Sequence, residues 1–128
     1  MVNTKKFIKK QAITNLKCYL YNCRMLFVKM IQSPFSLENH HIEISKRHFS
    51  FLEPNEANQL LRINTALRAL DSDEQIIIFH KYLGKQTLMD FEIQNLMAIS
   101  ERTYYRKKKR ALIKLAIALH FLPFNIKG

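Results

Sequence analysis

The side chains best suited to binding chemistry crowd into one segment, residues 100–112, which reads SERTYYRKKKRAL. Guanidinium, ammonium, carboxylate and phenol groups all occur within it. On a helix, residues three and four positions apart share a face, so several of these polar groups would lie together on one side. The residues on that face are Glu101, Arg102, Tyr105, Arg106 and Lys109. Such a face offers donors and acceptors of the kind that reach base edges in a DNA groove.

The residues around this segment predict the elements that would position it. The pattern indicates a short helix at about residues 90–96, a tight turn at 97–99 and a long helix after it. Ser100 would begin the long helix, because its hydroxyl can accept from an unpaired backbone N–H there. The side chains expected to point inward are Ile93, Ile99, Tyr104, Ala111 and Leu115. An apolar underside and a basic outer face directly after a helix and a turn are typical of a DNA recognition helix.

Composition and charge fit a small helical domain with a polyanionic partner. The chain has 128 residues and an apolar fraction of 48%, enough for one hydrophobic core. With only 2 glycines and 3 prolines, few turns are expected, and the predicted fold is all-α. The formal charge of +11 divides into +7 over residues 1–32, −3 over 33–99 and +7 over 100–128. Two basic ends around a mildly acidic middle indicate nucleic acid as the partner.

Other chemistries lack a matching pattern. Cys18 and Cys23 have neither CxxC spacing nor a histidine pair, so we expect no disulfide framework and no metal site. No Gly-rich phosphate loop, paired-carboxylate motif or nucleophile–histidine arrangement appears, which argues against an enzyme. The most apolar run, residues 115–124, is too short to span a bilayer, and no signal peptide is evident. The expected location is the cytoplasm.

Residues 5–32 predict one helix with an apolar seam. The seam residues are Ile13, Leu16, Leu20, Cys23, Phe27 and Met30. Two interpretations remain open: the seam packs on the rest of the domain, or it forms a homodimer through residues 13–30. A membrane-surface helix or a transit peptide is a weaker alternative, because the amphipathicity is modest.

Proline and polar residues mark the boundaries between the remaining elements. Ser33-Pro34 should end the first helix, and residues 34–54 read as a linker with some extended structure. Apolar stripes predict helices at about 55–70 and 74–83, with Gly84 as a cap and Asp90 as the N-cap of the next helix. The stripe of the first of these is Ala57, Leu60, Leu61, Ile63, Asn64, Leu67 and Leu70. The predicted domains are 1–33, a basic amphipathic helix; 34–54, a linker; 55–122, a helix-turn-helix domain; and 123–128, a tail.

Residues 92–112 resemble region four of the sigma factors, with which they align without gaps. Their sequence is EIQNLMAISERTYYRKKKRAL. Gln94 stands where that family has a small alanine, and Ala98 where it has the turn glycine. Ala98 implies either a left-handed residue that is not glycine or a slightly different turn. The whole chain resembles the ArpU family of phage-encoded regulators, through AITNLKCYLYNCRML, the Ser-Pro linker, ALRALDSDEQIIIFHKYL and TYYRKKKRAL.

This resemblance implies a small cytoplasmic activator of late phage or prophage genes in Gram-positive bacteria, without enzymatic activity or cofactor. Carried over by position, the base contacts to double-stranded DNA fall on Glu101, Arg102, Tyr105 and Arg106. The phosphate contacts fall on Ser100, Thr103, Lys107, Lys108, Lys109 and Arg110. The last four of these cover too wide an arc to read bases together, and the stem of Lys107 or Lys108 could instead cover the core.

Three alternatives remain at this point. The chain could be a protein-binding module that docks on RNA polymerase or another transcription factor, using Asp71, Asp73 and Glu74, with only non-specific DNA binding. It could bind RNA, although it lacks the aromatic platforms of common single-strand binders. The basic helix could also be a solvated surface with no specific partner.

Overall fold

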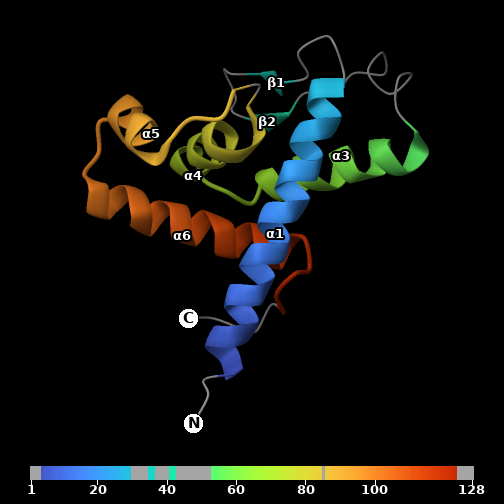
Figure 1. The fold of residues 1–128 in the computed structure, drawn as a ribbon, viewed down its shortest axis with the longest axis horizontal. Coiled ribbons are helices and arrows are strands. Elements are labelled where there is room, and N and C mark those ends of the chain that lie inside the picture. The colour runs from blue at the N-terminus through green and yellow to red at the C-terminus, as the bar shows by residue number, and fades with distance from the viewer. Residues whose placement is uncertain (1–3, 30–34, 37–40, 43–52, 85, 124–128) are drawn as a thin grey trace.

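The computed structural model describes residues 4–29, 35–36, 41–42, 53–84 and 86–123 (Figure 1). Its helices are α1 (Thr4–Lys29), α3 (Pro54–Leu67), α4 (Ser72–Ile78), the π-helix η1 (Phe79–Leu83), α5 (Asp90–Met97) and α6 (Glu101–Ala118). A short antiparallel pair, β1 (Phe35–Ser36) and β2 (His41–Ile42), lies in the predicted linker, with Phe35 opposite Ile42. The fold is all-α, as the composition and the periodicity predict.

Helix α1 packs against α3, η1 and α6, and its apolar seam enters their shared core. Ala12, Leu16, Leu20 and Cys23 are buried there beside residues of the later helices, including Leu115. Of the two interpretations of the seam, packing within the chain is confirmed. The dimer through residues 13–30 stays a prediction, but these four side chains are already covered within the chain. The side chains of Phe27 and Met30 lie outside the described residues.

Helix α3 contributes the opposite wall of the core. It begins at Pro54, whose fixed φ suits the first turn of a helix, and the Glu56 carboxylate accepts the Glu53 backbone N–H at 3.0 Å. Leu60, Ile63 and Leu67 are buried, as expected. The expectation for Leu61 was wrong, because its side chain is 45% exposed. Successive residues of a helix point about 100° apart, so Leu61 points away from the buried side on which Leu60 lies.

The predicted helix at 74–83 is two segments rather than one. Asp71 and Glu74 form a capping box at the start of α4, with side chain to backbone distances of 2.8 Å and 2.9 Å. After Ile78 the helix widens into η1, which closes with the Gly84 N–H donating to the Phe79 carbonyl at 2.7 Å. Gly84 is the predicted cap residue, but its backbone is extended (φ −65°, ψ 159°) rather than left-handed.

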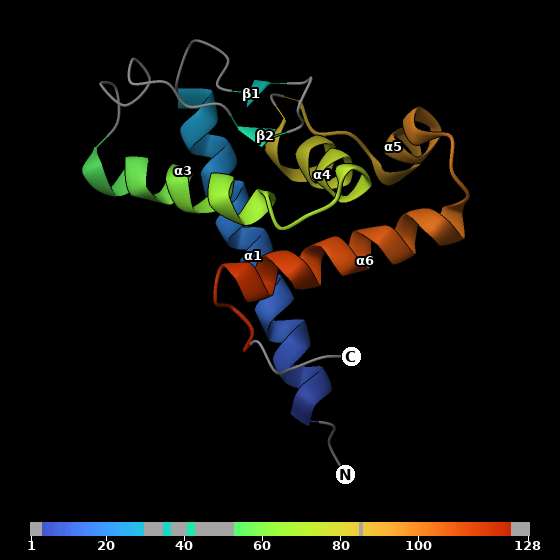
Figure 2. The same ribbon diagram turned by 180° about the vertical axis from the view of Figure 1, so that it is seen from behind.

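A second, smaller core lies between α4, α5 and the start of α6. Ile77, Ile93 and Tyr104 are fully buried in it, and Met97 and Ile99 pack around them. This cluster fixes the position of α5 relative to the first turns of α6. Figures 1 and 2 show α5 at one end of the molecule, next to the start of α6 and far from α3.

Candidate nucleic-acid interface

The turn between α5 and α6 is closed by a left-handed residue that is not glycine. Ala98 has φ 55° and ψ 44°. Its N–H donates to the Asn95 carbonyl at 3.2 Å, and the Ile99 N–H donates to the Gln94 carbonyl at 3.4 Å. These two bonds are those of a Schellman motif, in which a left-handed residue ends the helix. Of the two alternatives for Ala98, the left-handed alanine is the one present.

Helix α6 begins as predicted. Ser100 is its N-cap, and the Ser100 Oγ accepts the Thr103 backbone N–H at 3.1 Å. The Ser100 hydroxyl also donates to the Thr103 hydroxyl at 2.9 Å. The two hydroxyls of the predicted phosphate contacts are therefore bonded to each other at the start of α6.

Asp90 has a different role from the predicted one. The N-cap of α5 is Met89, and Asp90 is the first residue of the helix. Its carboxylate accepts the Tyr104 hydroxyl at 2.6 Å and the Lys108 ammonium at 3.1 Å and 3.2 Å, and Lys81 lies 3.6 Å away. The prediction of an N-cap was wrong because spacing alone does not show that two turns of α6 pass beside this carboxylate.

The electrostatics of this cluster follow from its contacts. Partial burial would raise the pKa of Asp90, but the hydrogen bond from Tyr104 and the bond and charge of Lys108 outweigh it, so the pKa is lowered. Burial raises the pKa of the Tyr104 hydroxyl well above its ordinary value, and the bond to Asp90 raises it further. The carboxylate is thus held charged and the phenol neutral, which keeps α5 attached to α6.

Three lysines of α6 are neutralised by acids of the preceding helices. Lys107 pairs with Asp73 at 3.1 Å, Lys108 pairs with Asp90, and Lys114 pairs with the Glu74 carboxylate at 2.8 Å. No local pattern predicts these pairs, because each joins residues between 18 and 40 positions apart.

The pairs change the assignment of two predicted phosphate contacts. The side chains of Lys107 and Lys108 are only 20% and 15% exposed and lie against the domain. The low exposure is compatible with the prediction that the stem of Lys107 or Lys108 covers the core.

Two of the same ion pairs involve acids of the predicted protein-binding surface, which comprises Asp71, Asp73 and Glu74. Glu74 is fully buried, its second carboxylate oxygen has no partner, and Asp73 is held by Lys107. Asp71 is exposed, but its carboxylate caps α4. Each of these acids therefore already has a partner within the chain, and of the three only Asp71 and Asp73 keep exposed surface.

The other predicted site residues face solvent. Arg102, Arg106, Lys109 and Arg110 are exposed on the side of α6 opposite Ala111 and the core. Helical geometry places these four cations within an arc of about 100°. Within the described part of the chain, no acid lies within ion-pairing distance of them.

Glu101 and Tyr105 lie on one flank of these cations. Both are exposed, Tyr105 by 46%, and the Lys108 ammonium sits 5.7 Å from the centre of the Tyr105 ring. The predicted base-contact residues are therefore brought to one solvent-facing surface. We call Glu101, Arg102, Tyr105, Arg106, Lys109 and Arg110 the α6 outer face.

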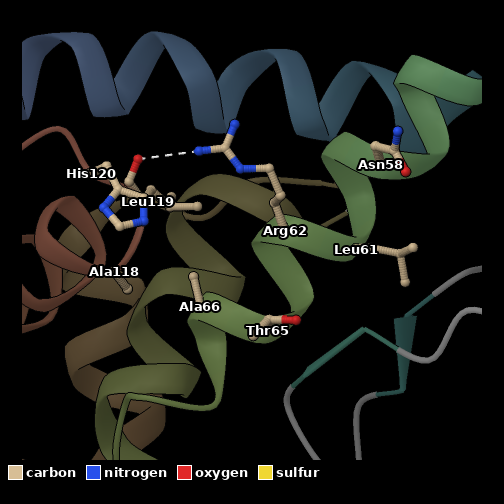
Figure 3. A pocket seen from close by; sticks show the side chains of 8 residues that line it. All are labelled: Asn58, Leu61, Arg62, Thr65, Ala66, Ala118, Leu119 and His120. Carbon is tan, nitrogen blue, oxygen red and sulfur yellow. Dashed lines mark hydrogen bonds between the residues drawn. The ribbon is translucent and has the colours of Figure 1, made fainter.

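A hollow lies between α3 and the end of α6 (Figure 3). It measures about 540 Å³ and is open to solvent. Its Arg62 guanidinium donates to the Leu119 carbonyl at 3.3 Å and lies 5.9 Å from the Tyr19 ring centre, so this cation already has partners. The hollow lies at the junction of α3 with the end of α6.

Within the described residues, no group of three or more histidine, cysteine or acidic side chains is placed to hold a metal ion. In the same part of the chain, no helix has both the length and the apolar character needed to cross a bilayer.

The two cysteines differ in environment. Cys18 is exposed on α1, whereas Cys23 is buried beside Gln59, and burial raises the pKa of its thiol to about 12. Cys23 is a core residue, as its position in the apolar seam predicted.

The likeness to sigma-factor region four and to the ArpU family rests on the sequence motif alone. Comparisons of the chain with protein-family models, with curated proteins and with solved structures find no match.

Proposed function

We propose that this protein is a sequence-specific DNA-binding transcriptional regulator that inserts α6 into the major groove. One observation carries the proposal: α6 sorts its cations into two sets. Three lysines are paired with acids of α4 and α5, while four exposed cations gather on the opposite side without an acid partner. This arrangement supports the proposal, because a recognition helix needs one side fixed to its domain and the other free for DNA.

The chemistry of the α6 outer face suits base readout. Arg102 and Arg106 can each offer two parallel donors to a guanine, and Glu101 can accept from a cytosine amine. Tyr105 can contact a thymine methyl group or stack on the backbone. Lys109 and Arg110 can reach flanking phosphates, so we expect binding to weaken steeply as salt rises.

The test is selection from a randomised duplex pool at physiological salt, run in parallel with the wild type and Arg106→Ala. Arg68→Ala is the matched control, because Arg68 is an exposed arginine at the end of α3. We expect a motif with the wild type and the control, and its loss with Arg106→Ala, since one bidentate contact supplies about 1–3 kcal/mol of discrimination. An unchanged motif with Arg106→Ala would show that another surface reads the bases.

A second candidate function is docking on RNA polymerase or another transcription factor, with DNA bound non-specifically. It is favoured by large exposed apolar side chains at the start of and along α5, where Met89, Phe91 and Leu96 are each about 60% exposed. Large exposed apolar groups of this kind are common at protein interfaces. The double variant Phe91→Ser/Leu96→Ser should lose binding to purified RNA polymerase while keeping the DNA motif. Retained polymerase binding would argue against a docking role for Phe91 and Leu96.

A further inference from the structure

A row of lysines runs along one side of α1. Lys6, Lys10 and Lys17 are exposed, and α1 as a whole contains no acidic residue. Spacings of four and seven residues place the three side chains within an arc of about 40°. Lys6 and Lys17 are about 16 Å apart along the helix axis at the normal rise per residue. We call Lys6, Lys10 and Lys17 the α1 row.

A contact further along α1 shows which way this row faces. Arg24 follows Lys17 by seven residues, so it lies on the same side of the helix. Its Nε donates to the Gly84 carbonyl at 3.0 Å, and Gly84 closes η1. The opposite flank of α1 turns to α3, where the Tyr19 hydroxyl donates to the Gln59 carbonyl at 3.2 Å. The α1 row therefore faces the side of the molecule that holds η1, α4, α5 and the start of α6.

The arrangement of the helices brings the row near the α6 outer face. In Figures 1 and 2 the N-terminal half of α1 extends past α6, on the side of α6 that is turned away from α4. The α6 outer face also looks away from α4, because Lys107 and Lys114 reach α4 from the other side of the helix. Two basic surfaces thus meet at an angle where α1 crosses α6.

We propose that the α1 row binds phosphates of the same DNA duplex, beside the segment that α6 reads. The inference rests on the proposed function, because α6 sets the position of the duplex. Lysine ammonium groups suit this role as point charges for phosphate, and an acid-free helix has no group that would repel a DNA backbone. The row would lengthen the DNA footprint on one side and add affinity without adding base preference.

The test compares two double variants of α1 that change the net charge equally. Lys10→Gln/Lys17→Gln removes two members of the row. Asn15→Asp/Asn22→Asp is the matched control, because both asparagines are exposed on the other side of the same helix. All four positions are solvent-facing, so circular dichroism and thermal melting should show both proteins folded like the wild type.

The measurement is affinity for a random-sequence duplex of about three helical turns, over a range of salt concentrations. Losing two phosphate contacts should lower the slope of log affinity against log salt by about 1.8 with the lysine variant, and leave it unchanged with the control. The motif selected from a randomised pool should be the same for all three proteins.

The outcomes separate this inference from the proposed function. A lysine variant with the wild-type slope, or a control that loses as much slope as the lysine variant, would overturn the α1 contact. If no protein selects a motif but the lysine variant alone loses slope, the readout by α6 fails and the α1 contact stands. If a motif is selected but the lysine variant has the same slope as the wild type, the readout by α6 stands and the α1 contact fails.

Discussion

The hydrogen bond from Tyr104 to Asp90 attaches α6 to α5. A double-mutant cycle measures how much this bond contributes to the free energy of unfolding. The single changes are Tyr104→Phe, which removes only the hydroxyl, and Asp90→Ala, which removes the acceptor. The Tyr104 ring is fully buried, so phenylalanine can keep its packing against Ile77 and Ile93.

The magnitude follows from the geometry. A hydrogen bond to a charged group contributes about 1.5–3 kcal/mol to stability. The 2.6 Å distance and the buried donor favour a strong bond, but the Asp90 carboxylate is 24% exposed and shared with Lys108. We therefore expect a coupling energy near the lower end, about 1.5 kcal/mol, which corresponds to a melting shift of roughly 5 °C. Asp90→Ala should cost more than Tyr104→Phe, since it also leaves Lys108 without its acid.

Urea unfolding of the wild type, both single variants and the double variant gives the four free energies of the cycle. Tyr21→Phe is the control, because Tyr21 is 60% exposed on α1 and its hydroxyl makes no bond in the described residues. The control should stay within about 0.5 kcal/mol of the wild type. A coupling energy below about 0.5 kcal/mol would refute the reasoning that this bond holds the two helices together.

Three further predictions concern the same structure. Ala98→Gly should raise the free energy of unfolding by about 0.5–1 kcal/mol in urea titrations, because glycine relieves the left-handed strain but adds unfolded-state entropy; a loss of stability would contradict this. Acid melts should show stability falling as pH drops below the ordinary aspartate value of 3.8, because the pKa of folded Asp90 is lowered, and Asp90→Asn should flatten that fall. A thiol reagent should modify Cys18 rapidly and Cys23 only after unfolding, and rapid labelling of both would argue against the packing of α1.

Local patterns predicted the elements of the candidate site well. The Ser100 cap, the turn at Ala98 and the burial of Tyr104, Ala111 and Leu115 all depend on neighbours within one or two helical turns. Spacing of this kind is visible in a sequence because helical geometry fixes which side chains share a face.

The errors arose where distant segments meet. Asp90 bonds across to α6 instead of capping α5, and Lys107 and Lys108 turn toward acids rather than solvent. The widening at Phe79 also has no local signal, since a π-helical segment carries the same residues as an α-helix. Each of these features is set by tertiary packing, which a single sequence does not encode in its spacing.

The burial of α1 has a consequence for how the chain folds during synthesis. The α1 seam is made first, but the core residues that cover it come from α3, η1 and α6, and Leu115 is translated about ninety residues after Cys23. At roughly 5–20 residues per second, the seam stays uncovered for on the order of 5–20 seconds. During that interval, repulsion between the lysines of α1 would oppose the association of nascent chains through the same apolar stripe.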